Sequence, residues 1–318
     1  SVGERLIAAR GDFPDLTPHD SADSLAADPS VDIAIIATPP VLHAELALQL
    51  LRAGKHVVIE KPMCLRRADA DEIIATAAEH DRVVTVHQSR RWDRDWLALR
   101  HVVDGGEIGD VFNTETFVGG FEHPCRAWHS EESISGGAIY DWGSHHVDWI
   151  LQLYGSSPAR VLCSTHNRVW NDTTNVDQLS LWMQWDDGRE ATFRQSDVCA
   201  IRRPKFHVEG TKGTVEGHYE PVVTDRIVAG RGHVMDVSHH AEAPVDLAVA
   251  TYDEVLGVRT TTAPPAPSPG WGFHRNLADH LLLGEPLAVR PEQSRDVVAV
   301  LEAGQRSGAN GAELIELG

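Results

Sequence analysis

VDIAIIATPP, residues 31–40, is the stretch that decides the fold of this chain. Its nearly continuous apolar run predicts a strand that is covered on both faces, as strands of parallel sheets are. Thr38, Pro39 and Pro40 end that strand. Residues 41–53 have helical periodicity, which predicts a helix directly after the strand.

The same alternation continues downstream. Residues 55–59 (KHVVI) predict a second buried strand, residues 66–80 a helix, and residues 83–87 (VVTVH) a third strand. Upstream, residues 3–10 and 20–28 predict short helices, the second with an Asp or Ser cap. Strands that alternate with helices indicate a doubly wound α/β sheet.

After about residue 108 the pattern changes to short segments that alternate polar and apolar positions, which is typical of an antiparallel sheet with one covered face. We therefore predict two domains, a Rossmann-type α/β domain over 1–108 and an α+β domain with an open, mostly antiparallel sheet over 109–318. The expected strands are 111–118, 159–166, 177–185, 190–197 and 205–210, followed by a turn at 211–214, a stiff Pro-rich connector at 260–270, and helices at 273–283 and 291–307.

Composition excludes several classes of function. The net charge of −19 argues against a nucleic-acid partner, because phosphate binding needs clustered Lys and Arg. No apolar run approaches the about 18 residues of a membrane helix, and no signal peptide is visible. The four cysteines form no CxxC pair, which favours free thiols and a cytoplasmic location.

The stretch most informative about chemistry is GGAIYDWGSHHVD, residues 136–148. It places Asp141 and His145 four residues apart at the expected start of a helix, so they share a face. The imidazole of a histidine suits general-base work because its pKa lies near neutrality. A carboxylate one turn away can orient the ring or bind the same hydroxyl. The structural alternative is a helix cap at Asp141 and a surface histidine.

Lys61 follows a buried strand and precedes Pro62, so its position is well fixed. A lysine there can bind or polarise a hydroxyl group. The bond to Pro62 can be cis, which would turn the lysine toward the cleft. The alternative is a solvated loop lysine.

Further residues are candidates for contact with a substrate. Arg90 lies at the carboxyl edge of the predicted sheet, where open sheets bind ligands, and either it or Arg91 is expected to be structural. His146 points about 100 degrees away from His145, which favours a packing role. No HExxH or CxxC pattern is present, so we expect no metal site. A loop before the glycine pair contributes three more candidates, which are His123, Arg126 and Trp128.

Four motifs occur in order: ATPP with His43, AGKHVVIEKP at 53–62, GEIGDV at 106–111, and the glycine-pair stretch. With them the chain resembles, over essentially its whole length, the glucose-fructose oxidoreductase / inositol dehydrogenase / rhizopine-catabolism (Gfo/Idh/MocA) family. The resemblance implies NAD or NADP bound between a Rossmann domain and a sheet domain whose exposed face forms homodimers or homotetramers. It also implies catalytic roles for Lys61, Asp141 and His145, and cofactor contacts from Thr38, Pro39, Pro40, His43, Glu60 and Lys61.

The chain departs from the family at its start, where the GxGxxG loop and the acidic residue of the second strand are absent. In the usual strand order, 3-2-1-4-5-6, the first strand is central. Without it, residues 31–37 would expose a long apolar edge. We therefore expect residues 1–318 to be part of a longer polypeptide.

Two hypotheses of function follow. The first is an oxidoreductase that transfers hydride between NAD(P) and a secondary alcohol or ketone of a sugar, cyclitol or related polyol. The second is an inactive sugar-binding or scaffolding pseudo-enzyme that lost its dinucleotide loop.

Overall fold

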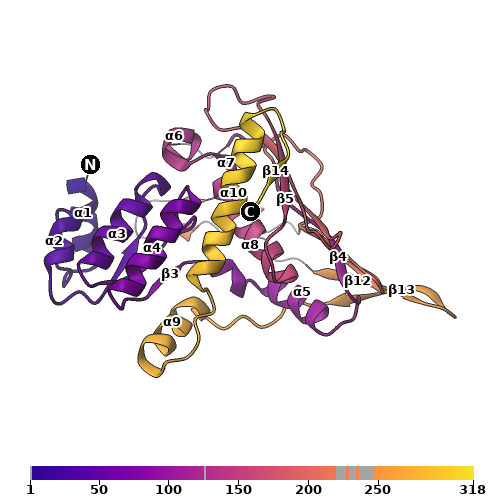
Figure 1. Ribbon diagram of the computed structural model, residues 1–318, viewed down its shortest axis with the longest axis horizontal. Helices are drawn as coiled ribbons and strands as arrows, with labels where there is room; N and C mark the ends of the chain where they lie inside the picture. The colour runs from indigo at the N-terminus through magenta and orange to yellow at the C-terminus, as the bar shows by residue number, and fades with distance from the viewer. Residues whose placement is uncertain (1, 125–126, 220–226, 229–233, 236–245) are drawn as a thin grey trace.

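The computed structural model of the protein describes residues 2–124, 127–219, 227–228, 234–235 and 246–318. Figure 1 shows a helical part with a small sheet near the N-terminus and a large sheet on the other side of the long helix α10 (Pro291–Ala309). The predicted parallel sheet followed by a mostly antiparallel sheet is confirmed. The domain boundary at residue 108 stays a prediction.

The first sheet contains three parallel strands, β1 (Ile33–Ile36), β2 (His56–Ile59) and β3 (Val84–Val86), in that order. Helices α3 (His43–Arg52) and α4 (Arg67–Glu79) pack against it. Helices α1 (Val2–Asp12) and α2 (Ala22–Ala27) precede it, and the side chain of Ser21 caps α2 as predicted.

The expectation that β1 is covered on both faces is wrong for the described residues. Ala34 and Ile36 are buried, but Ile33 is 40% and Ile35 is 62% exposed. Successive side chains of a strand point to opposite faces, so one face of β1 packs on the core and the other is left exposed by the described residues. β1 pairs only with β2 in the part of the chain that is described.

The second sheet has nine strands in the order β13-β12-β9-β8-β4-β7-β6-β5-β14. Among the described residues, neighbouring strands of this sheet run antiparallel, except that β4 and β7 run parallel. Its strands are β4 (Val111–Gly119), β5 (Arg160–His166), β6 (Gln178–Gln184), β7 (Glu190–Ser196), β8 (Phe206–Gly210), β9 (Gly213–Gly217), β12 (Leu247–Asp253), β13 (Gly257–Ala263) and β14 (Ile315–Glu316). A separate two-stranded ladder joins β10 (Ile227–Val228) and β11 (Val234–Met235).

Helices cover one face of the large sheet. α7 (Ala138–Asp141), α8 (Gly143–Tyr154) and α10 pack on the buried side chains of β5, β6 and β7, among them Cys163, Leu181 and Phe193. α5 (Arg94–Asp104) packs on β12 and shares a core with β8 and β9. The remaining helices are η1 (Pro40–Leu42), η2 (Ser89–Trp92), η3 (Ala127–Ser130), α6 (Glu132–Ser135) and α9 (Gly272–Leu283). None of the described helices is long and apolar enough to cross a bilayer.

The predicted connector at 260–270 begins later than expected. Residues 260–263 belong to β13 and pair with β12. Three of these residues are β-branched threonines, which fit a pleated strand. The chain leaves the sheet only where the prolines begin, at Pro264.

A buried ion pair joins α5 to the start of β8. The Nζ of Lys205 donates to Oδ2 of Asp95 at 2.5 Å, and the two side chains are 2% and 3% exposed. Lys205 also lies 5.1 Å from the ring centroids of Trp149 and Phe206. Because water is excluded here, each charge depends on the other.

We predict that Lys205→Met lowers the free energy of unfolding by about 3–5 kcal/mol, because it leaves the Asp95 carboxylate buried and unpaired. The double variant Lys205→Met/Asp95→Leu should regain most of that loss. Urea unfolding followed by circular dichroism measures both. Arg52→Ala, which removes an exposed pair with Glu72, serves as the control and should change little. Equal stability of the single and double variants would contradict the prediction.

Candidate active site

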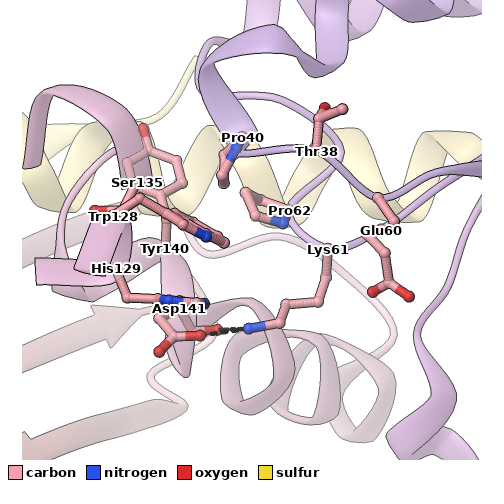
Figure 2. Close-up of a pocket in the computed structure, with 11 residues that line it drawn as sticks. Thr38, Pro40, Glu60, Lys61, Pro62, Trp128, His129, Ser135, Tyr140 and Asp141 are labelled. Atoms are coloured by element: carbon pink, nitrogen blue, oxygen red, sulfur yellow. Dashed lines mark hydrogen bonds and ion pairs between the residues drawn. The ribbon is translucent and has the colours of Figure 1, made fainter. Parts of the chain in front are cut away.

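A cavity of about 200 Å³ lies at the carboxyl ends of β1 and β2, where the first sheet meets the segment from η3 to α7. This is the edge at which open parallel sheets bind ligands. Figure 2 shows side chains from both parts of the molecule around it. The lining residues are Ala37, Thr38, Pro40, Glu60, Lys61, Pro62, Trp128, His129, Ser135, Tyr140 and Asp141.

The two parts meet through Lys61 and Asp141. Lys61 Nζ donates to Oδ1 of Asp141 at 2.5 Å and to its backbone oxygen at 3.0 Å. Their side chains are 22% and 34% exposed, so the pair remains open to the cavity (Figure 2). The Lys61–Pro62 peptide bond is cis. An ammonium group has three N–H donors, so one hydrogen of Lys61 is left for a third acceptor.

The glycine pair determines the backbone conformation of the turn that leads into α7. Gly136 and Gly137 have φ angles of +87° and +106°, which side chains rarely adopt. A Cβ on Gly136 would also lie 2.3 Å from the side chain of Leu65. Asp141 is the last residue of α7 and His145 lies in the first turn of α8, so the expected single helix is two short helices joined at Trp142. Asp141 does not cap α8.

Gln88, rather than Asp141, holds His145. The Gln88 amide donates from Nε2 to the backbone oxygen of Ser144 at 3.0 Å, and its Oε1 lies 3.1 Å from Nδ1 of His145. A backbone oxygen can only accept, so the amide nitrogen must face Ser144 and the amide oxygen must face the ring. Nδ1 of His145 therefore carries the hydrogen. Nε2 makes no hydrogen bond within the described residues and is free to accept a proton.

The surroundings of His145 keep its ring neutral. The side chain is only 6% exposed. Burial is the largest cause that holds the pKa of His145 well below its usual value, and the positive charges of Lys61 and Arg90 act in the same direction. A neutral imidazole with an open Nε2 is the form that can take a proton from a hydroxyl group.

His43 lies behind the cavity rather than in it. It is 1% exposed, and its two ring nitrogens lie 2.8 Å from the backbone oxygens of Thr38 and Pro62. The ring thus joins the loop after β1 to the loop after β2. A neutral imidazole donates only one of these bonds, and burial, the largest cause, lowers the pKa of His43. Pro39 does not line the cavity.

Both arginines after β3 make contacts within the protein, and Arg90 forms an ion pair with Asp93 at 3.1 Å. The Arg90 guanidinium lies 4.9 Å from the ring centroid of Trp142, between Asp141 and His145 in the sequence. Arg91 is structural, because its Nε and Nη2 donate to the two carboxylate oxygens of Asp148 at 2.8 and 2.6 Å. His146 is also a packing residue, 1% exposed and stacked on Phe193 at 4.8 Å.

The loop before the glycine pair contributes one of its three candidates to the cavity. Trp128 lines the cavity and stacks on His129. His123 instead contacts the carboxylate of Asp172 at 2.9 Å and the ring of Trp170. Arg126 lies outside the described residues.

Two contacts at the site were not predicted from the sequence, those of Gln88 with His145 and of His87 with Glu60. Gln88 is 2% exposed and follows β3 at the ligand edge of the sheet, a position that could have singled it out. Glu60 accepts from Nδ1 of His87 at 2.7 Å, across the ends of β2 and β3. The hydrogen bond to His87 lowers the pKa of Glu60 against the raising effect of burial, the largest single cause.

Two family models match the chain and together cover more than half of it. The model for the oxidoreductase family with an NAD-binding Rossmann fold matches residues 7–88. The model for the GFO/IDH/MocA C-terminal domain matches residues 96–216. The first contains Lys61 and Gln88, and the second contains Asp141 and His145.

Characterised and solved relatives cover most of the chain. The scyllo-inositol 2-dehydrogenase (NADP(+)) IolW of Bacillus subtilis is 26% identical over 305 residues, 95% of this chain and 84% of that protein. The 1,5-anhydro-D-fructose reductase of Ensifer adhaerens is 27% identical over 228 residues, 71% and 68% of the two chains. The crystal structure of an NAD-binding protein from Listeria innocua is 26% identical, with a TM-score of 0.80 over 98% of this chain and 86% of that one.

We predict that Gln88→Glu raises the pKa of His145 by more than about 1 unit, because a carboxylate at hydrogen-bond distance favours the charged ring. Gln88→Met adds no charge and should leave the pKa of His145 low. An NMR titration of the histidine ring protons measures both, with the His145 signal assigned by its loss in His145→Gln. An unchanged pKa in Gln88→Glu would show that Gln88 does not contact the ring.

Proposed function

The chain belongs to the GFO/IDH/MocA family of NAD-binding oxidoreductases, and from this we propose that it transfers hydride between NAD or NADP and a secondary alcohol or ketone of a sugar, cyclitol or related polyol. The observation that carries the proposal is the ion pair of Lys61 with Asp141, which joins two separate parts of the chain at one cavity. His145 does not line that cavity, but Lys61 lies near enough to its ring to help lower its pKa, after burial as the largest cause. The names of the two characterised relatives support this class of substrate.

The ends of β1 and β2 fit a role in holding the cofactor. Thr38 Oγ1 is enclosed there without a hydrogen-bond partner, and Pro40, Glu60 and Lys61 line the same cavity. When bound, NAD(P) supplies the acceptor or donor of the hydride. Residues 1–318 contain no GxGxxG sequence, so the residues proposed to hold the cofactor are Thr38, Pro39, Pro40, Glu60 and Lys61, with His43 supporting the two loops.

His145 is proposed as the general base. Its Nδ1 is occupied by Gln88, its Nε2 is open, and its low pKa keeps it neutral near pH 7. In oxidation Nε2 takes the proton of the substrate hydroxyl, and in reduction the same atom returns a proton to the carbonyl oxygen. Gln88 acts through His145 and is a positioning residue.

Lys61 is proposed to bind the reacting oxygen. Asp141 takes two of its three N–H donors and fixes the direction of the third. A hydrogen bond from an ammonium group stabilises the negative charge that gathers on that oxygen as its proton leaves. Arg90, His123, Arg126 and Trp128 remain proposed substrate contacts, of which Trp128 lines the cavity.

The proposal extends to assembly and location. The exposed face of the large sheet supports a homodimer or homotetramer, and three free thiols among the described residues support a cytoplasmic location. The net charge of −19 supports the absence of a nucleic-acid partner. None of the site contacts favours the inactive alternative.

We predict that His145→Ala lowers turnover by roughly 100-fold or more, because it removes the proton acceptor. The assay follows reduced nicotinamide absorbance with NAD(P)+ and inositols or sugars, and with NADPH and 1,5-anhydrofructose. His101→Ala on the exposed surface of α5 is the matched control and should keep full turnover. Near-full turnover of His145→Ala would remove His145 from this role. Polyol binding by the parent protein with neither NAD(P) binding nor turnover would favour the pseudo-enzyme.

A further inference from the structure

One wall of the active-site cavity is built from two very short helices. Trp128, His129 and Ser135 of η3 and α6 form this wall, and they line the cavity across from Thr38 (Figure 2). Each of the two helices has only four residues. Helices this short are not stable by themselves, so the position of the wall depends on bonds to neighbouring chain. Several of those bonds come from residues 173–177, the loop before β6.

The loop binds the wall through its backbone at Ser130. The backbone oxygen of Ser130 accepts hydrogen bonds from the backbone N–H groups of Thr174 and Asn175, at 3.2 and 3.3 Å. The hydroxyl group of Thr174 donates to the same oxygen at 3.1 Å and accepts from the N–H of Glu132 at 2.8 Å. These bonds place Asn175 against the wall, with its side chain buried and the whole residue 6% exposed.

The side-chain amide of Asn175 donates to two residues of the wall. Its Nδ2 donates to the backbone oxygen of His129, and it lies 3.3 Å from Oγ of Ser135. A backbone oxygen can only accept, so the amide nitrogen must face His129. Ser135 requires the same orientation, because its single hydroxyl hydrogen goes to the backbone oxygen of Glu131 at 3.0 Å. The lone pairs of that hydroxyl then accept from Asn175 and from the N–H of Gly137.

This orientation leaves the other end of the amide unsatisfied. Oδ1 of Asn175 is enclosed and has no hydrogen-bond partner within the described residues. An enclosed acceptor without a partner costs free energy, which argues for a role of Asn175 other than stability. An apolar side chain of similar size would avoid that cost, but it could not bind His129 and Ser135.

We propose that Asn175 is a positioning residue, which sets the affinity for the polyol by holding Trp128, His129 and Ser135 at the cavity. The inference rests on the proposed function. Asn175 reaches Trp128 through His129, because the rings of those two residues stack with their centroids 3.6 Å apart. Within the described residues, the side chain of Asn175 makes no hydrogen bond to a residue proposed to hold NAD(P). Its effect should therefore fall on the polyol and not on the cofactor.

The test is the steady-state kinetics of Asn175→Leu, with the polyol and NAD(P) varied separately. We expect the KM for the polyol to rise about tenfold, because the wall loses both bonds from the amide. The KM for NAD(P) and kcat should change less than about threefold, and the thermal unfolding midpoint should change little. Asn171→Leu is the matched control on the same loop. Asn171 is exposed and its amide donates to the backbone oxygen of Val169, so this variant should keep the parental KM.

Asn175→Asp keeps the shape of the side chain and adds a dependence on pH. A carboxylate cannot donate a hydrogen bond, whereas a protonated carboxyl donates through its one O–H. Burial raises the pKa of an introduced carboxyl group. The ratio of the polyol KM of this variant to that of the parent should therefore fall as the pH is lowered from about 8 to about 6. A loss of packing alone would leave that ratio constant.

Three outcomes would overturn the inference while the proposed function stands. They are a polyol KM of Asn175→Leu within about twofold of the parent, an equal rise in Asn171→Leu, and equal rises in the KM for the polyol and for NAD(P) with a lower unfolding midpoint. The third would show that Asn175 only stabilises the fold. If the parent protein turned over no polyol or sugar, the proposed function would fail and this inference would fail with it.

Discussion

The candidate site depends on one buried ion pair, that of Arg91 with Asp148. The two side chains are 7% and 2% exposed and meet through two charge-assisted hydrogen bonds. Arg91 also donates to the side chain of Gln293 on α10. Separating η2 from α8 would leave a buried charge without its partner, which costs a large amount of free energy. Gln88 and Arg90 lie within three residues of Arg91 in the sequence, and Trp142 and His145 lie within six residues of Asp148. The ion pair therefore helps to hold Gln88 against His145 and Arg90 over the ring of Trp142.

The sequence allowed the local parts of the site to be predicted, and the structure adds how they are joined. Lys61 was predictable because a buried strand and a proline surround it, and Asp141 and His145 because their spacing and the glycine pair are local features. The bond between Gln88 and His145 spans 57 residues, and no local periodicity encodes it. The same reason explains His43, whose ring binds two loops that follow different strands. Side-chain contacts between separate elements are set by tertiary packing.

The fold was predicted where hydrophobic periodicity was strong and was missed where it was ambiguous. Alternating burial along β5 to β7 follows the alternation of polar and apolar residues closely. The apolar run of β1 indicated burial on both faces, yet Ile33 and Ile35 are exposed, because an apolar sequence shows what a strand can bury and not what packs on it. The prolines from residue 264 onward led to the prediction of a connector over residues 260–270. Residues 260–263 pair with β12 instead, because their threonines favour a strand.

The surroundings of His145 favour release of a proton from its ring over uptake of one. Burial and the nearby Lys61 and Arg90 all oppose a positive charge on the ring, so the ring is neutral before the reaction and is a weaker base than a free imidazole. The same three factors make the protonated ring a stronger acid than a free imidazolium, so it readily returns its proton to an oxygen that regains negative charge. A glutamate in place of Gln88 would stabilise the charged ring and weaken that return. A neutral amide fixes the tautomer without adding charge, which keeps both directions of proton transfer accessible at one atom.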